Sequence, residues 1–388
     1  MRFALFAAIA LFFIGGLDAQ LIHIGLFHDQ VVTSVVVSCS SGRYNLESED
    51  GILDTLEEGE SIFIYLENDS LVLHNSERTY GRFGEIRFNF LALKSSIRIR
   101  PVEPATDSRT YGDNLILRPH DRFITIINHV DFDKYLAGVV EAEAGPNAER
   151  EFYKAQSVLC RTYAVKNLNR HEPEGFSLCD GVHCQVYKGN SIYNPGILAA
   201  IVETTGQVLT DNRHQLVTAA YHSNSGGQTQ RAADVWLTDH DYLQSVVDPF
   251  SLHQPNAKWK ETIAFRDWKN YLYKNGMKSV AKIPDEIIYI EQMRRKKYFI
   301  LDRDSILLTK IREDWGFKST FFDMFPEGDS IVVWGKGYGH GIGMSQEGAM
   351  KMARDEYLYQ DILQFYFFNV KLMDYKDLPG YSVPEVNF

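Results

Sequence analysis

The strongest constraint on the fold is a series of short runs in residues 21–125 in which polar and apolar side chains alternate. The pattern is clear at residues 61–66, 86–90 and 97–100. Period-two alternation is typical of β-strands with one buried face. Clusters of Gly, Asn, Asp and Ser separate the runs, as turns require. We therefore predict a β-rich N-terminal region, to which β-branched runs at residues 22–27, 31–37 and 123–127 also belong.

Helical periodicity begins after this region. Asp131 is placed to cap a short helix through residue 140, which the Gly145-Pro146 pair ends, and Asn147 is placed to cap a longer helix over residues 148–169. Further helices are expected at residues 196–204 and 345–355, with a strand at residues 206–209. The predicted fold class is α+β, with a mixed β-sheet core and a few helices.

The first residues have the pattern of a secretory signal peptide. Arg2 gives a positive start, residues 3–17 are almost wholly apolar, and Ala19 suits cleavage before Gln20. We expect residues 1–19 to be a signal peptide and the protein to be exported, to the periplasm or the cell exterior. An uncleaved membrane anchor is the alternative. We expect no transmembrane segment beyond the signal peptide, since no later run is long and apolar enough.

The net charge of the chain argues against some classes of binding partner. The formal net charge is −11 at pH 7. Such a chain lacks the basic surface that binding to a nucleic-acid backbone or an anionic membrane requires. We expect no nucleic-acid partner, whereas a neutral or zwitterionic polymer remains a suitable substrate.

Residues 135–143 bring a carboxylate, Glu143, to the end of a short helix beside a Gly-Pro break. A residue at the end of a rigid element is well placed to face a cleft. An apolar cleft would raise the pKa of this carboxyl, so that it stays protonated and acts as a general acid. Glu141 and Glu143 as solvated surface charges are the alternative reading.

The next helix carries two polar residues, Gln156 and Arg161, on an otherwise apolar surface. Buried polar groups need hydrogen-bond partners. We expect a network around them, which either supports the fold or orients a catalytic group.

Four residues close in sequence form a candidate metal site: His171, Cys179, His183 and Cys184. Two thiolates and two imidazoles complete a closed tetrahedral shell for Zn²⁺, which makes a structural ion the preferred reading. A disulfide between Cys179 and Cys184 is the alternative in an oxidising compartment. Cys39 and Cys160 are expected to be buried free thiols.

Two loops are rich in glycine and polar side chains. Residues 221–227 (YHSNSGG) suit hydrogen bonding to sugar hydroxyls, although an ordinary turn has the same composition. Residues 335–348 contain alternating glycines, which permit positive φ or close backbone approach. The run matches neither the dinucleotide fingerprint nor the Walker loop. His340 within it is a candidate functional residue.

Together these segments resemble the SpoIID/LytB family, named for stage II sporulation protein D and an amidase enhancer. The resemblance covers nearly the whole chain after residue 19, and it rests on residues 135–143, 154–164, 185–189, 221–227, 311–322 and 337–349. It implies a β-rich region at residues 20–125 and a single large SpoIID-like catalytic domain, with elaborations, at residues 126–388.

The sporulation members of that family are lytic transglycosylases of peptide-stripped peptidoglycan glycan strands. Their essential Glu, in a Glu-Met-Pro segment, falls on Glu143, although Ala144 and Gly145 stand here in place of the Met and Pro. The resemblance implies that Glu143 is the acid/base and that the four His and Cys residues bind zinc. Our own candidates for holding the glycan are Arg161, Tyr221, His222, His340, Ser345 and Gln346.

Two other functions stay open on the sequence. The family also contains non-catalytic wall-binding proteins that enhance a cell-wall amidase, which would then be this protein's partner. A true glycoside hydrolase would need a second carboxylate, either Glu141 or another carboxylate.

Overall fold

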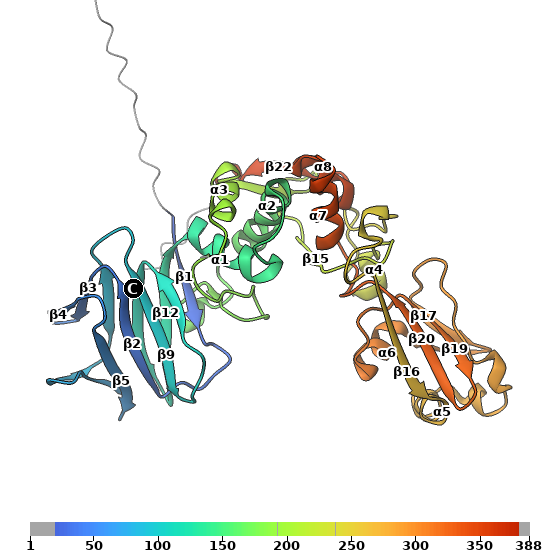
Figure 1. Ribbon diagram of the computed structural model, residues 1–388, viewed down its shortest axis with the longest axis horizontal. Helices are drawn as coiled ribbons and strands as arrows, with labels where there is room; N and C mark the ends of the chain where they lie inside the picture. Colours follow the sequence, from blue (N-terminus) through green and yellow to red (C-terminus); the bar gives the residue numbers. More distant parts are fainter. Residues whose placement is uncertain (1–19, 192, 237, 380–388) are drawn as a thin grey trace, which may run out of the picture.

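The computed structural model describes residues 20–191, 193–236 and 238–379. The expected signal peptide lies outside the described residues. Figure 1 shows three regions: the N-terminal β-sheets, a layer of helices, and a second β-containing unit, after which the chain returns to the helical layer with α7 and α8. No helix within the described part of the chain is long and apolar enough to cross a membrane. The mixed α/β composition confirms the predicted fold class.

Two sheets form the N-terminal region. The first has the order β13-β1-β12-β11-β8-β3-β4, with bounds β1 Leu21–Leu26, β3 Tyr44–Ser48, β4 Gly51–Leu56, β8 Ile86–Phe90, β11 Asn114–His120, β12 Phe123–Asp131 and β13 Leu178–Cys179. The second has the order β10-β9-β2-β5-β6-β7, with bounds β2 Ser34–Ser41, β5 Ser61–Glu67, β6 Ser70–His74, β7 Thr79–Phe83, β9 Ser96–Glu103 and β10 Arg109–Gly112.

Alternation explains how these sheets bury one face. In β9, Ile97 and Ile99 are fully buried while Arg98 and Arg100 are exposed. Buried side chains of both sheets belong to one hydrophobic core, which continues into the helical layer. Strand β13 pairs in parallel with β1, with Cys179 opposite Gly25. This pairing fixes one of the candidate metal ligands to the edge of the sheet.

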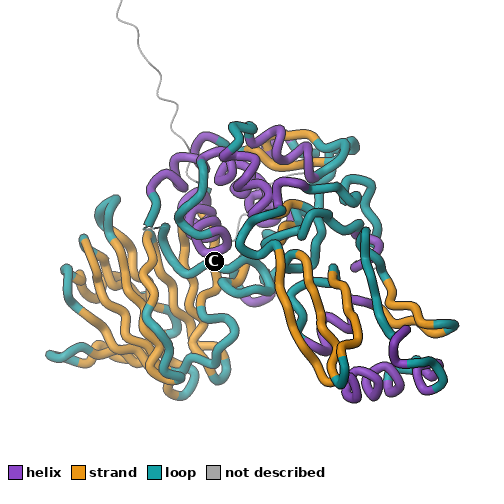
Figure 2. The backbone as a smooth tube through the Cα atoms, turned by 45° about the vertical axis from the view of Figure 1, so that its right-hand side comes forward, coloured by secondary structure: helices purple, strands orange, loops and turns teal. Residues whose placement is uncertain are grey.

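The helical layer is built around α2, which contacts α1, α3, α7 and α8. Figure 2 shows these helices gathered between the two β-containing regions. The helices are α1 Phe132–Ala144, α2 Arg150–Lys166, α3 Pro195–Glu203, α4 Ala232–Val235, α7 Gln346–Arg354 and α8 Tyr359–Tyr366. Two strand pairs accompany them, β14 Gln207–Thr210 with β22 Lys371–Asp374, and β15 Tyr221–His222 with β21 Met344–Ser345. The 3-10 turns are η1 Glu172–Glu174, η2 Pro249–Ser251, η3 Lys278–Ala281, η4 Asp285–Ile287 and η5 Tyr375–Asp377.

The two helix starts differ in how well the sequence predicted them. Asp131 caps α1 as predicted, because its carboxylate accepts a 3.0 Å hydrogen bond from the amide of Lys134. The prediction that Asn147 caps the next helix is wrong, since α2 begins at Arg150. Tyr153 explains the difference: its hydroxyl accepts from the Ala148 amide and donates to the Gly145 carbonyl, each at 2.9 Å. This clamp holds residues 145–148 as a loop.

The second β-containing unit has a hydrophobic core of its own, which includes Trp268, Leu272, Phe299 and Ile311. A three-stranded sheet, a hairpin and two helices surround it: β16 Lys258–Ala264, α5 Phe265–Lys274, β17 Tyr298–Leu301, β18 Asp304–Leu307, α6 Leu308–Trp315, β19 Phe322–Glu327 and β20 Ser330–Lys336. The chain enters this unit from the helical layer and returns to it through the glycine-rich loop that ends at β21. The sequence had indicated only a mixed α/β stretch here.

Candidate functional site

A cavity of about 630 Å³ lies on the helical layer. Its volume is in the range of small-molecule and saccharide sites. The end of α1, the C-terminal half of α2 and several loops contribute to it, through Glu143, Tyr163, Lys166, Asn167, Arg170, 182–186, 217–221, Trp236 and His340. Glu143 is the one carboxylate among these described lining residues.

Glu143 lies on the last turn of α1, which ends at Gly145 with φ 74°. A positive φ is easy for glycine, so the chain turns sharply here and the carboxylate stays at the cavity wall. Oε1 accepts a 3.0 Å hydrogen bond from the amide of Val186. Burial raises the pKa of the carboxyl above its usual range, while hydrogen bonds from Val186 and the Tyr221 side chain partly oppose the rise. A group held in this way can be protonated in the cavity and can release its proton there.

Gln346 links the glycine-rich end of the chain to the Glu143 turn. Its Nε2 donates to the backbone carbonyl of Glu143 at 3.3 Å and to Oε1 of the buried Gln156 at 3.4 Å. Of the two polar residues expected to form a network on α2, Gln156 is therefore linked to the site. Gln346 positions the backbone of Glu143 and does not line the cavity.

Arg161 belongs to a different network. Its side chain is fully buried, with hydrogen bonds to the Thr204 carbonyl at 2.7 Å, the Ile201 carbonyl at 3.2 Å and Asp133 at 3.1 Å. These bonds satisfy the C-terminal carbonyls of α3. A direct contact between Arg161 and a glycan would require these hydrogen bonds to break. Arg161 therefore supports the fold in this structure and does not face the cavity.

Three of the expected glycan-holding residues lie together. Tyr221 and His340 line the cavity, and the rings of His222 and His340 are 5.5 Å apart. Nδ1 of His222 contacts the Ile342 carbonyl at 3.0 Å, while its buried Nε2 has no hydrogen-bond partner among the described residues. Burial lowers the pKa of His340 to about 4 and that of His222 well below its usual value. At neutral pH both imidazoles are uncharged hydrogen-bonding groups.

The alternating glycines hold His340 against β15. Gly343 has φ 69°, and a Cβ there would lie 2.1 Å from the carbonyl oxygen of Ala220. Gly339 has φ 108°, and its Cβ would lie 2.9 Å from Cβ of His222. Both the positive φ and the close approach predicted from the sequence are present.

Ser345 supports the fold at this point. It is the N-cap of α7, and its hydroxyl accepts from the amides of Gly348 at 3.4 Å and Ser225 at 3.1 Å. The side chain is fully buried. Ser345 therefore sets the start of α7, on which Gln346 follows, and does not reach the cavity.

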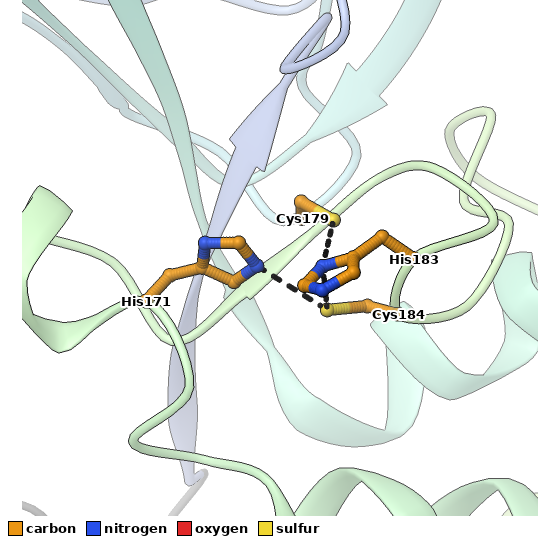
Figure 3. Close-up of side chains that lie close together, drawn as sticks. All are labelled: His171, Cys179, His183 and Cys184. Carbon is orange, nitrogen blue, oxygen red and sulfur yellow. Dashed lines mark hydrogen bonds between the residues drawn. The ribbon is translucent and has the colours of Figure 1, made fainter.

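The four candidate metal ligands converge, as Figure 3 shows. Their ligand atoms all lie within 4.8 Å of one another. Sγ of Cys184 lies 3.5 Å from Nε2 of His171 and 3.9 Å from Nδ1 of His183, and Sγ of Cys179 lies 3.8 Å from Nδ1 of His183. Tetrahedral Zn–N and Zn–S bonds place N and S ligands about 3.6 Å apart, so this cluster fits such an ion.

The protonation and surroundings of the cluster also suit a metal. All four cysteines are free thiols in the structure, which confirms the expectation for Cys39 and Cys160 and leaves Cys179 and Cys184 unbridged. A hydrogen bond from Cys179 lowers the pKa of Cys184 to about 6, which favours a thiolate. Nδ1 of His171 contacts Glu174 at 2.5 Å, the carboxylate–histidine arrangement common behind metal ligands.

Comparison with known proteins finds a family match over part of the chain. Residues 120–210 match the family described as Stage II sporulation protein, SpoIID. This segment of the chain is similar to the SpoIID family. The chain is 29% identical over 258 residues to Stage II sporulation protein D of Bacillus subtilis (strain 168), which covers 62% of this chain and 74% of the relative. It is 28% identical over 269 residues to the protein of the same name from Bacillus amyloliquefaciens, covering 64% and 76%.

A second kind of SpoIID relative covers more of the chain. The Amidase enhancer of Bacillus subtilis (strain 168) is 27% identical over an alignment 398 positions long including gaps, which covers 87% of this chain and 53% of that longer relative. The SpoIID segment at residues 120–210 contains Glu143, Arg161 and all four candidate metal ligands. The His222, His340 and Gln346 positions lie outside it.

Sequence reasoning missed several residues that line the cavity. Lys166 and Arg170 line the cavity, as does Val186, whose amide holds Glu143. A backbone amide has no sequence signal. For the two cations there was a partial signal, since Lys166 lies near the end of the helix predicted over residues 148–169 and Arg170 follows four residues later, directly after that helix.

Proposed function

We propose that this protein is a peptidoglycan lytic transglycosylase that cleaves peptide-stripped glycan strands and leaves 1,6-anhydro-N-acetylmuramic acid ends. The supporting observation is Glu143, the one carboxylate among the described residues that line the 630 Å³ cavity, with a pKa raised by burial. The catalytic unit on this proposal is the domain at residues 126–388, exported by the signal peptide at residues 1–19.

The reaction needs one group that first gives and then takes a proton. Protonated Glu143 donates its proton to the glycosidic oxygen as the bond to C1 of N-acetylmuramic acid breaks. The resulting carboxylate accepts the proton of the C6 hydroxyl of the same sugar, and O6 bonds to C1. The product retains the C6 oxygen in a 1,6-anhydro ring, no water is consumed, and Glu143 is protonated again. The attacking hydroxyl is tethered to the reacting carbon, which gives it a high effective concentration.

The neighbours of Glu143 support both halves of this cycle. The Val186 amide and the Tyr221 side chain bond to the carboxylate and so stabilise it after proton donation. The uncharged His340 lies on the same cavity wall and suits a sugar hydroxyl. Arg161, Ser345 and Gln346 support the site from behind.

A hydrolase with two carboxylates is a poorer fit. The Glu141 carboxylate accepts from the Ser191 hydroxyl at 2.6 Å and from the amides of Tyr193 and Asn194. It lines a separate cavity, formed in part by residues 106–110 and 188–190. It is therefore poorly placed to activate a water molecule for a bond that Glu143 protonates.

We propose that a structural Zn²⁺ binds to His171, Cys179, His183 and Cys184. Four protein ligands leave no open coordination position, so such an ion would supply stability and no Lewis acid. Cys184 lies two residues before Val186, so the ion would also hold the loop whose amide contacts Glu143.

A wall-binding enhancer of a cell-wall amidase is the second candidate. The similarity to the Amidase enhancer, which extends over 87% of this chain, favours it. On this alternative the cavity binds glycan without cleaving it, and the partner is an N-acetylmuramoyl-L-alanine amidase.

A digest of peptide-stripped peptidoglycan by residues 20–388, read by mass spectrometry, separates the candidates. Wild-type protein is expected to release anhydro-ended fragments, and Glu143→Gln to be slower by about 100-fold or more, because general acid catalysis contributes that much. Glu58→Gln, an exposed carboxylate in the N-terminal region, is the matched control. Intact glycan in all samples, with the protein folded and bound, would replace this proposal by the enhancer. Reducing ends in place of anhydro ends would establish a hydrolase.

A further inference from the structure

Two cations lie at the end of α2, on the wall of the cavity that contains Glu143. Lys166 is the last residue of α2, and Arg170 follows four residues later. Among the described residues that line the cavity, Lys166, Arg170 and Glu143 are the only ones of the types Lys, Arg, Asp and Glu. The cavity thus has two cations and one carboxylate in a chain whose formal net charge is −11. A local excess of positive charge in an acidic protein indicates an anionic group on the ligand.

Neither cation is paired with an Asp or Glu side chain among the described residues. Nζ of Lys166 donates to the Leu216 carbonyl at 3.1 Å and the Thr218 hydroxyl at 3.2 Å. Nη1 of Arg170 donates to the Tyr163 hydroxyl at 2.7 Å and the His183 carbonyl at 3.0 Å. These acceptors are uncharged, and within the described ranges neither cation forms an ion pair with an Asp or Glu side chain. Arg170 also interacts with the side chain of Cys184, one of the candidate metal ligands. Both residues reach solvent at the cavity, Lys166 with its side chain partly buried, and these bonds hold them in place.

The surroundings of Lys166 favour an anion. Partial burial lowers the pKa of its ammonium, because removal from water disfavours the charged form, and Asp211 opposes this only from a distance. A carboxylate bound at this wall would restore the favourable environment of the ammonium. A charge-assisted hydrogen bond of this kind is stronger than a neutral one.

The proposed substrate carries such a group only in one form. In N-acetylmuramic acid the lactyl substituent ends in a carboxyl group. This group is an uncharged amide when a stem peptide is attached, and it is a free carboxylate when the peptide has been removed. We propose that Lys166 and Arg170 bind this free lactyl carboxylate and thereby select peptide-stripped strands. The inference rests on the proposed binding of glycan in this cavity, and it assigns the selectivity to two named residues.

Measuring the affinity for glycan strands, instead of their cleavage, tests this inference independently of catalytic activity. The probe is a set of labelled glycan strands in three forms, with free lactyl carboxylates, with these converted to methylamides, and with intact stem peptides. All are measured in the Glu143→Gln background, so that no strand is cut. We expect the free-carboxylate strands to bind about tenfold more tightly than the methylamide strands, the worth of one charge-assisted hydrogen bond.

Variants of Lys166 give the decisive comparison. Lys166→Gln is expected to bring the ratio between the two strands to within about twofold by weakening only the free-carboxylate strand. Lys166→Arg, which keeps the charge, should retain the preference. Lys282→Gln, an exposed lysine of the second unit, is the matched control and should match the parent. Arg170→Lys serves as a second variant, because Arg170 also contacts the metal-binding loop.

Several outcomes would overturn the inference. These are equal binding of free and methylamide strands by the parent, equal weakening of both strands by Lys166→Gln, or tightest binding of strands with intact stem peptides. The last result would mean that the cations bind a peptide carboxylate. Absence of binding to all strands would also overturn it. If wild-type protein does not cleave glycan but the Lys166-dependent preference is present, the transglycosylase proposal fails and this one stands.

Discussion

The backbone amide of Val186 donates a 3.0 Å hydrogen bond to the carboxylate of Glu143. Val186 follows Cys184 by two residues, so the candidate metal-binding loop and the candidate acid/base are joined through a few bonds. The same loop lines the cavity on which Glu143 lies. We therefore expect a disturbance of the His and Cys cluster to displace the Val186 amide and so to change the position of the Glu143 carboxylate.

The pH dependence of cleavage should depend on Tyr221. Glu143 must be protonated to donate, so activity should fall as the pH rises through its raised pKa. The Tyr221 hydrogen bond lowers that pKa, and its removal should raise it further. In Tyr221→Phe we therefore expect the alkaline fall in the rate to move to higher pH, measured as kcat/KM against pH. A fall that moves to lower pH, or that does not move, would contradict this assignment.

Removal of the metal should destabilise the protein. We expect one Zn²⁺ per chain by elemental analysis, and we expect Cys184→Ser or a chelator to lower the free energy of unfolding by about 3 kcal/mol or more, since a tightly bound ion stabilises only the folded state. Cys39→Ser, at a buried thiol far along the chain, should keep the metal. A metal-free wild type with a Cys179–Cys184 disulfide would exclude the zinc site.

Arg161 should matter for folding rather than for binding. Arg161→Ala removes the buried guanidinium that bonds to Asp133 and to the carbonyls of Thr204 and Ile201. Loss of one partner of a buried charge network costs about 3 kcal/mol or more, measurable by denaturant unfolding. A variant of normal stability with weakened glycan binding would instead support a direct contact.

The glycine-rich loop should tolerate no side chain at Gly343. Gly343→Ala adds a Cβ only 2.1 Å from the Ala220 carbonyl at a φ of 69°. We expect a cost of about 2 kcal/mol or more in unfolding free energy and a loss of cleavage, because Tyr221 follows Ala220. Gly84→Ala is the control, since its Cβ would meet only the end of the Glu49 side chain, at 3.3 Å. Thermal unfolding of both variants tests the difference.

The sequence by itself determined that residues 21–125 are β-rich, that helices follow them, and which side chains could carry chemistry. Alternation in residues 97–100 reports burial on one face, and this signal is local. The metal cluster was also readable, because its four residues lie within fourteen positions of one another. Asp131 was a readable cap for the same reason, since its partner lies three residues away.

Only the tertiary structure decided which polar residues meet at the cavity. Gln156 and Arg161 are five residues apart on one helix, yet the first lies toward Glu143 and the second toward α3. Gln346 reaches the Glu143 turn across 203 positions of chain. Asn147 does not cap α2 as predicted, because the hydroxyl of Tyr153 forms hydrogen bonds with the neighbouring backbone groups and holds them in a loop. Contacts between distant segments depend on how helices pack, and packing energy is shared among many side chains, so no short pattern encodes it.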